Sequence, residues 1–203
     1  MVRPLQEQFE PETVDRIGKL KTAFQSLPFQ GEPARYLTRE IVGCLEAGLL
    51  LAAVQVALSL LEMFFRELLI VVLFKEKYDQ DIPSAHLLLD RIRQQIEDGR
   101  SPRYDLYLIL DQLTKREIVD QPDAEEIKTL YKTVRIPIHH GLTRRFLKLS
   151  MGCSGNGALE QLFLSLARFQ QFEEMIEDHS LGHLEAVVSF MGKYSDDEVS
   201  YED

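Results

Sequence analysis

The stretch AGLLLAAVQVALSLL, residues Ala47–Leu61, decides the fold class because it runs for 15 residues without a charge. Glu62 ends this run, so its length falls short of the roughly 20 apolar residues that cross a bilayer. We therefore predict a long helix buried at the centre of a soluble helical bundle. Gly43 and Gly48 are expected to kink the early part of this helix.

The spacing of apolar residues and the residues typical of helix ends divide the remaining chain into further helices. The central helix is expected to begin at Thr38, with Glu40 in its first turn, and to fade in the charged run KEKYDQD. No segment alternates apolar and polar residues as strands do, so the predicted class is all-α. The other helices are expected over Pro11–Ser26, from Pro83 to about Gly99, from Ser101 onward, from DQPDAEE onward, and over Ala158–Asp178 and Leu184–Met191.

The overall composition favours one cytoplasmic domain. The chain has 203 residues, of which 45% are hydrophobic, and this is enough for one continuous core. Its two cysteines are far apart and no secretory leader is recognisable, so a reducing cytoplasm is expected rather than a disulfide framework. A net charge of −10 repels membranes and nucleic acids on average. No membrane association is therefore expected, and a partner with phosphates needs a local positive surface.

Such a surface is indicated by residues 128–148, called the basic segment below, which contain six basic residues and no acidic residue. Because the whole chain carries −10, the rest of it carries −16. Two interpretations stay open: a phosphate-binding surface, or a solvated helix face whose cations neutralise a helix C-terminus. The basic residues are Lys128, Lys132, Arg135, Arg144, Arg145 and Lys148.

The centre of the basic segment, VRIPIHHGLTRRF, combines arginines and histidines with helix-breaking residues. In an unbroken helix Arg135 and His139 share a face, whereas His140 points away from it. Pro137 removes a backbone donor and kinks the helix, which lets His140 turn towards Arg135. Gly141 permits the close approach of a ligand. An arginine beside a histidine suits phosphate binding and proton transfer near neutral pH.

The segment RIPIHHG resembles the signature of the HEPN (higher eukaryote and prokaryote nucleotide-binding) superfamily, in which an arginine precedes a histidine–glycine pair at a kink between helices. The matching residues are Arg135 and His140, with four residues between them. Two other stretches are similar to prokaryotic members. EAGLLLAAVQVALSLLEMFFRELL resembles their long second helix, and LILDQLTKREIVDQPDAEEIKTLYKTVRIPIHHG resembles the run that leads to the signature.

The resemblance also suggests how the chain is divided. It covers about Glu46–Phe146, roughly half of the residues. We expect residues 1–35 to form an N-terminal helical extension, residues 36–192 to form the HEPN-like helical bundle, and residues 193–203 to form an acidic, disordered tail.

The resemblance implies, in the members that cut RNA, cleavage without a metal or another cofactor. His140 would then be the acid/base, Arg135 would clamp the phosphate, and the RNA would supply its 2′-hydroxyl as the nucleophile. His139 is either a second donor or an orienting neighbour, and a structural role is favoured for it. The other residues expected to contact RNA phosphates are Lys132, Arg144, Arg145 and Lys148.

Glu62 is a further candidate because Gln55, Ser59, Glu62 and Arg66 draw a polar stripe along the apolar helix. Polar groups on a buried helix need partners. Glu62 either pairs with Arg66 as an ordinary i, i+4 ion pair, or reaches Arg135 across the bundle and orients it, as the resemblance suggests.

Two functions follow from these observations. The first is a metal-independent endoribonuclease of a toxin–antitoxin or defence system, with an antitoxin or a nucleotidyltransferase as its partner. The alternative is a catalytically silent HEPN module that binds a protein or a nucleotide. Ile136 favours the alternative, because family ribonucleases commonly carry Asn, Asp or His after the arginine. A two-fold homodimer is expected, since it would bring together two copies of Arg135 and His140 and supply both an acid and a base.

Overall fold

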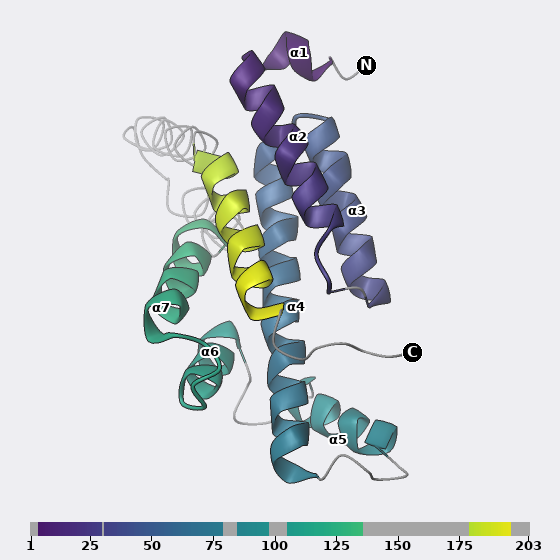
Figure 1. Ribbon diagram of the computed structural model, residues 1–203, viewed down its shortest axis with the longest axis vertical. Helices are drawn as coiled ribbons and strands as arrows, with labels where there is room; N and C mark the ends of the chain where they lie inside the picture. Colours follow the sequence, from purple (N-terminus) through teal and green to yellow (C-terminus); the bar gives the residue numbers. More distant parts are fainter. Residues whose placement is uncertain (1–3, 30, 79–84, 98–104, 136–178, 196–203) are drawn as a thin grey trace, which may run out of the picture.

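The computed structural model describes residues 4–29, 31–78, 85–97, 105–135 and 179–195. Within these ranges the regular structure is helical and no β-strand is present, which confirms the predicted all-α bundle (Figure 1). A helical segment without its own label covers residues 179–195. The labelled elements are α1 (Leu5–Gln8), α2 (Pro11–Gln25), α3 (Glu32–Glu46), α4 (Leu50–Lys77), α5 (Ala85–Glu97), α6 (Leu106–Thr114), α7 (Gln121–Leu130) and the π-helical turn η1 (Tyr131–Arg135).

The helix predicted from Thr38 to residue 77 is two helices, α3 and α4, which a tight turn at Gly48 separates. Gly48 has a φ of +74°, and its N–H donates to the carbonyl of Leu45. The next N–H, of Leu49, donates back to the carbonyl of Cys44 at 2.8 Å. These two bonds form a Schellman motif, which ends a helix at a left-handed residue. The prediction of one helix is therefore wrong, because the expected kink is a reversal that packs α3 against α4 (Figure 1).

Helix α4 carries the uncharged stretch, and it buries side chains along most of its 28 residues. It packs against α3, α5, α6 and η1. Phe64 meets Phe29 edge-on with ring centroids 5.5 Å apart, and Phe65 lies 6.0 Å from the ring of Tyr194 in segment 179–195. Apolar residues around most of its circumference are therefore covered by other helices. Among the described residues, no helix has both the length and the apolarity to cross a membrane.

Segment 179–195 lies against helices from the other end of the chain (Figure 1, yellow). Arg16 of α2 donates twice to Glu185, at 2.9 and 3.0 Å. The helix predicted over Leu184–Met191 is present and is longer at both ends. Residues 193–195, which were expected in the acidic tail, belong to this helical segment.

The other helix predictions differ from the structure mainly at helix ends. Helices α2 and α5 begin and end close to the expected residues, and α7 begins where expected. Helix α6 begins at Leu106, later than the expected Ser101, because the carboxylate of Asp105 accepts the Leu108 N–H and caps the helix. The boundary expected between residues 35 and 36 falls inside α3. The helix expected over Ala158–Asp178 lies outside the described residues.

Candidate functional site

The structure describes only part of the candidate site. Glu62 lies on α4, Lys132 lies on η1, and the backbone of Arg135 is the last residue of η1. The side chain of Arg135 and the kink at Pro137 lie outside the described part of the chain, so the contact predicted between Glu62 and Arg135 stays a prediction. The same holds for His139, His140, Arg144, Arg145 and Lys148.

Glu62 is a half-buried acid on α4, and both of its carboxylate oxygens have donors. Nη2 of Arg66 donates to Oε1 at 3.1 Å, so the predicted i, i+4 ion pair is present. The hydroxyl of Tyr131, the first residue of η1, donates to Oε2 at 3.3 Å. The side chains of Glu62 and Arg66 are 19% and 23% exposed, so water screens this pair less than an ordinary surface pair. Glu62 therefore connects α4 with η1.

The helix that leads into the basic segment changes its geometry before it reaches Arg135. Helix α7 ends at Leu130, and Tyr131–Arg135 form a π-helical turn, in which backbone bonds join residues five apart. The backbone therefore departs from α-helical geometry at Tyr131, before the chain reaches Pro137. The kink predicted at Pro137 and the relative faces of Arg135 and His139 lie outside the described residues and stay predictions.

Side-chain hydroxyls reach backbone carbonyls at the start of this turn. Oγ1 of Thr133 donates to the carbonyl of Thr129 at 2.8 Å, and the hydroxyl of Tyr107 donates to the carbonyl of Lys128 at 3.4 Å. Such bonds compete with helical N–H groups and favour bending. Pro137 adds to this effect, because it has no N–H to offer the carbonyl four residues before it. These features explain why the α-helix does not continue.

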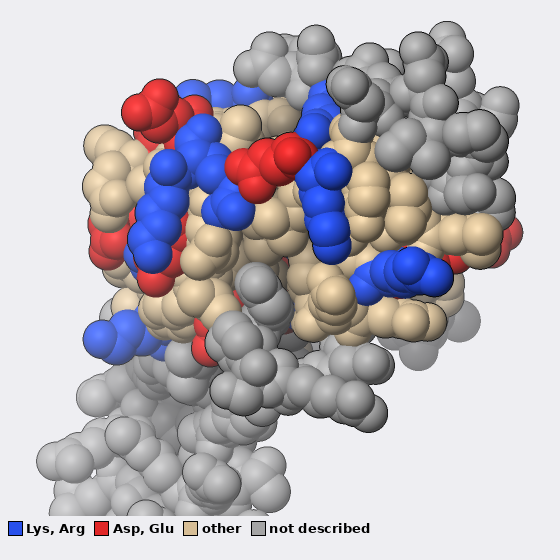
Figure 2. Space-filling view, turned by 90° about the horizontal axis from the view of Figure 1, so that it is seen from below, with Lys and Arg blue, Asp and Glu red and all other residues tan. Residues whose placement is uncertain are grey.

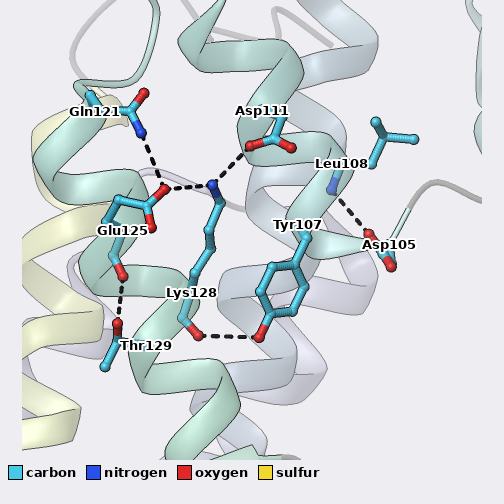
Figure 3. A network of polar contacts seen from close by, with 8 residues as sticks. All are labelled: Asp105, Tyr107, Leu108, Asp111, Gln121, Glu125, Lys128 and Thr129. Atoms are coloured by element: carbon cyan, nitrogen blue, oxygen red, sulfur yellow. Dashed lines mark hydrogen bonds and ion pairs between the residues drawn. The ribbon is translucent and has the colours of Figure 1, made fainter.

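Lys128, the first residue of the basic segment, is paired on both sides (Figure 3). Its Nζ lies 2.8 Å from a carboxylate oxygen of Asp111 on α6 and 2.8 Å from one of Glu125 on α7, and its side chain is 15% exposed. The hydrogen bond to Asp111, and then that to Glu125, raises the pKa of Lys128 above its usual value. Lys128 therefore stays protonated, and the two carboxylates compensate its positive charge. The accessible positive charge of the basic segment begins at the exposed Lys132.

The acidic start of α7 is held by segment 179–195. Nζ of Lys193 lies 2.7 Å from Asp120 and 2.6 Å from Asp123. The hydroxyl of Tyr194 donates to Asp123 at 2.5 Å and accepts the N–H of Asp120 at 3.2 Å. The bond from Lys193, and then that from Tyr194, lowers the pKa of Asp123. This network fixes α7, and with it η1, to segment 179–195.

Positive charge is not restricted to the basic segment. Figure 2 shows the end of the molecule at which α4 finishes, where Lys and Arg side chains are spread among Asp and Glu side chains. Helix α4 ends with Lys75 and Lys77, and between them Glu76 accepts a bond of 2.7 Å from Arg116. Lys77 is exposed. It therefore offers a comparison with Lys132, the exposed lysine of η1.

The described ranges hold no group of three or more His, Cys, Asp or Glu side chains that is arranged to bind a metal ion. His179 and His183 lie one helical turn apart, with ring centroids separated by 6.3 Å. Nδ1 of His183 is buried without a hydrogen-bond partner among the described residues. Burial, and then the nearby His179, lowers the pKa of His183. Among the described residues, these two histidines are too few for a structural zinc site.

Sequence reasoning missed Tyr131 and Tyr107. Ile127, Leu130 and Val134 are buried, so the helical spacing places Tyr131 beside the core, where its hydroxyl needs a partner. That signal is present in the sequence. The identity of the partner is not, because Glu62 is 69 residues away.

Comparison with known proteins does not identify the chain: no family model, no curated protein and no solved structure matches it. The resemblance to the HEPN superfamily therefore rests on Arg135, His140 and the two flanking stretches, and it stays a prediction. The all-α fold is established by the structure itself.

Proposed function

We propose that this chain is a HEPN-like protein that binds the phosphate groups of RNA at the basic segment, part of which forms η1, and cleaves the RNA without a metal. The observation that carries the proposal is the contact from Tyr131 to Glu62. It brings the half-buried acid of α4 to the same π-helical turn that ends at Arg135. Isolated π-turns occur frequently at functional sites, which supports a role for this one.

In the proposed reaction the RNA supplies its own nucleophile. The 2′-oxygen attacks the adjacent phosphorus and the bond to the 5′-oxygen breaks, which leaves a 2′,3′-cyclic phosphate and a 5′-hydroxyl. One histidine accepts the proton of the 2′-hydroxyl and another acid protonates the 5′-oxygen. His140 is the proposed acid/base, and Arg135 stabilises the charge that develops on the phosphate oxygens. The cations proposed for neighbouring phosphates are Lys132, Arg144, Arg145 and Lys148.

A two-fold homodimer completes this proposal. One chain offers a single well-matched histidine, His140, whereas the reaction is helped by an acid and a base on opposite sides of the phosphorus. Closed two-fold dimers are the commonest soluble oligomers. Two basic segments repel each other, so the interface would consist of apolar surface beside the motif, with the cations lining a cleft. An antitoxin or a nucleotidyltransferase is the partner protein that this function implies.

A catalytically silent module is the second candidate, and two observations favour it. Lys128 is neutralised by Asp111 and Glu125, so the basic segment presents less charge than its sequence suggests. Ile136 cannot orient Arg135 or contact a phosphate through its apolar side chain. Such a module would bind a protein or a nucleotide and leave RNA intact.

RNA cleavage in the presence of a chelator separates the two candidates. The wild-type protein, Arg135→Ala, His140→Ala and the control Lys77→Ala are each incubated with mixed RNA. Cleavage that leaves cyclic phosphate ends is expected from the wild type and from the control, because Lys77 lies at the far end of α4. The other two variants are expected to be inactive. A requirement for added magnesium would refute the mechanism, and binding of RNA or nucleotide without cleavage would favour the silent module.

A further inference from the structure

Tyr131 is held at both its ring and its hydroxyl. Its hydroxyl donates to Oε2 of Glu62 at 3.3 Å. Its ring meets the ring of Tyr107 edge-on, with centroids 6.0 Å apart and planes at 86°. The hydroxyl of Tyr107 in turn donates to the carbonyl of Lys128 at 3.4 Å. The two tyrosines therefore join α4, α6 and the end of α7 at the residue where the π-helical turn begins.

Glu62 gives Tyr131 a fixed partner. Arg66 donates to Oε1 at 3.1 Å, so the two oxygens of this carboxylate are engaged by different donors. A hydrogen bond to an ionised carboxylate is stronger than one between neutral groups, particularly where water is partly excluded. The contact from Tyr131 therefore adds a directional polar link between η1 and α4 to the apolar packing of Leu130 and Val134 around it.

We propose that Tyr131 is a positioning residue for Arg135, the last residue of η1. Through Glu62 and Tyr107 it holds η1 in its π-helical turn, and this sets the place of the Arg135 backbone four residues later. The role in RNA cleavage rests on the proposed function of Arg135. A π-helical turn is rare compared with an α-helical one, so side-chain contacts are needed to maintain it. Without the hydroxyl of Tyr131, the turn is expected to open or to change its geometry.

Amide hydrogen exchange tests this positioning without any assumption about activity. Tyr131→Phe and the matched control Tyr107→Phe each keep the aromatic ring and lose one donor, but only the first loses the bond to Glu62. Exchange over residues 132–135 is expected to become about tenfold faster in Tyr131→Phe. It is expected to change less than about twofold in Tyr107→Phe, whose longer bond goes to an uncharged carbonyl. Equal exchange in the wild type and Tyr131→Phe would overturn the proposal.

RNA cleavage then connects the positioning to the site. In an active protein, Tyr131→Phe and Glu62→Gln are expected to lose about tenfold in kcat with little change in KM. The double variant is expected to lose no more than either single variant, because both changes act through one contact. An unchanged kcat in Tyr131→Phe would overturn the positioning role. If the wild type does not cleave RNA while exchange differs as expected, the proposed function fails and the positioning of η1 by Tyr131 stands.

Discussion

Replacing Gly48 with alanine is expected to destabilise the bundle by about 2–3 kcal/mol. Gly48 has a φ of +74°, in the left-handed region where a residue with a Cβ costs roughly 1–2 kcal/mol. An added Cβ would also lie 2.6 Å from Oε1 of Gln8 and 3.0 Å from Cε2 of Phe9. The amide of Gln8 is the end of a flexible side chain and moves easily. The shift of the Phe9 ring adds about 1 kcal/mol.

The matched control is Gly43→Ala, the same substitution inside α3. An added Cβ at Gly43 meets no atom within 4 Å. Alanine is favoured over glycine in a helix by roughly 0.5–1 kcal/mol, so this variant is expected to be more stable than the wild type. Both substitutions restrict the unfolded chain equally. Their difference, about 3 kcal/mol, therefore reports on the folded turn at Gly48.

Urea unfolding followed by far-UV circular dichroism measures both variants. In a thermal melt, Gly48→Ala is expected to unfold at least about 4 °C below the wild type, since 1 kcal/mol corresponds to roughly 2–4 °C in a chain of this size. Adding Gln8→Ala should restore little, because it removes one close contact and leaves φ unchanged. If Gly48→Ala stays within about 0.5 kcal/mol of the wild type, the turn does not require a left-handed residue.

Three further predictions concern single side chains. Glu117 has a φ of +60° after α6, so Glu117→Gly is expected to stabilise the protein by about 0.5–1 kcal/mol in urea, and a loss of stability would contradict a strained turn. Tyr194→Phe removes the donor to Asp123 and the acceptor of the Asp120 N–H, so it should cost about 1–2 kcal/mol; an unchanged urea midpoint would show that this network does not stabilise the bundle. Burial holds the pKa of His183 below its ordinary value of 6.5. Between these two pKa values the unfolded chain binds a proton that the folded protein does not bind. The free energy of unfolding therefore falls as the pH drops below 6.5 towards the pKa of the folded state. His183→Gln is expected to flatten this part of the curve of stability against pH, and identical curves would contradict it.

Helices that depend on local signals could be predicted from the sequence. Pro11 opens α2, and Asp120 with Pro122 marks the start of α7. At Gly48 the sequence predicts an interruption of the helix, but it does not predict whether the chain kinks or reverses. A glycine between apolar residues is compatible with a kinked helix and with a Schellman turn. The packing of α3 against α4 decides between them, and that packing is not a local property.

The polar contacts of the candidate site also divide into local contacts, which the sequence predicts, and long-range contacts, which it does not. The pair of Glu62 and Arg66 spans four residues, so helical spacing is enough to predict it. The contact from Tyr131 to Glu62 spans 69 residues. Spacing indicates that the hydroxyl of Tyr131 needs a partner, but it does not indicate which helix supplies one. Only the arrangement of α4 against η1 supplies that information.

Charge counting along the chain overstates the positive surface for a similar reason. Lys128 belongs to the basic segment in the sequence, but in the folded protein its ammonium group forms ion pairs with the carboxylates of Asp111 and Glu125. Glu125 is only three residues away and lies on the same helix, but Asp111 comes from α6. Each cation that contacts a phosphate contributes to binding by releasing counterions from the nucleic acid, and a cation already paired with carboxylates releases fewer. Within the basic segment, the cations left to contact phosphates are therefore Lys132 and the basic residues after it, and Lys132 lies in the π-helical turn itself.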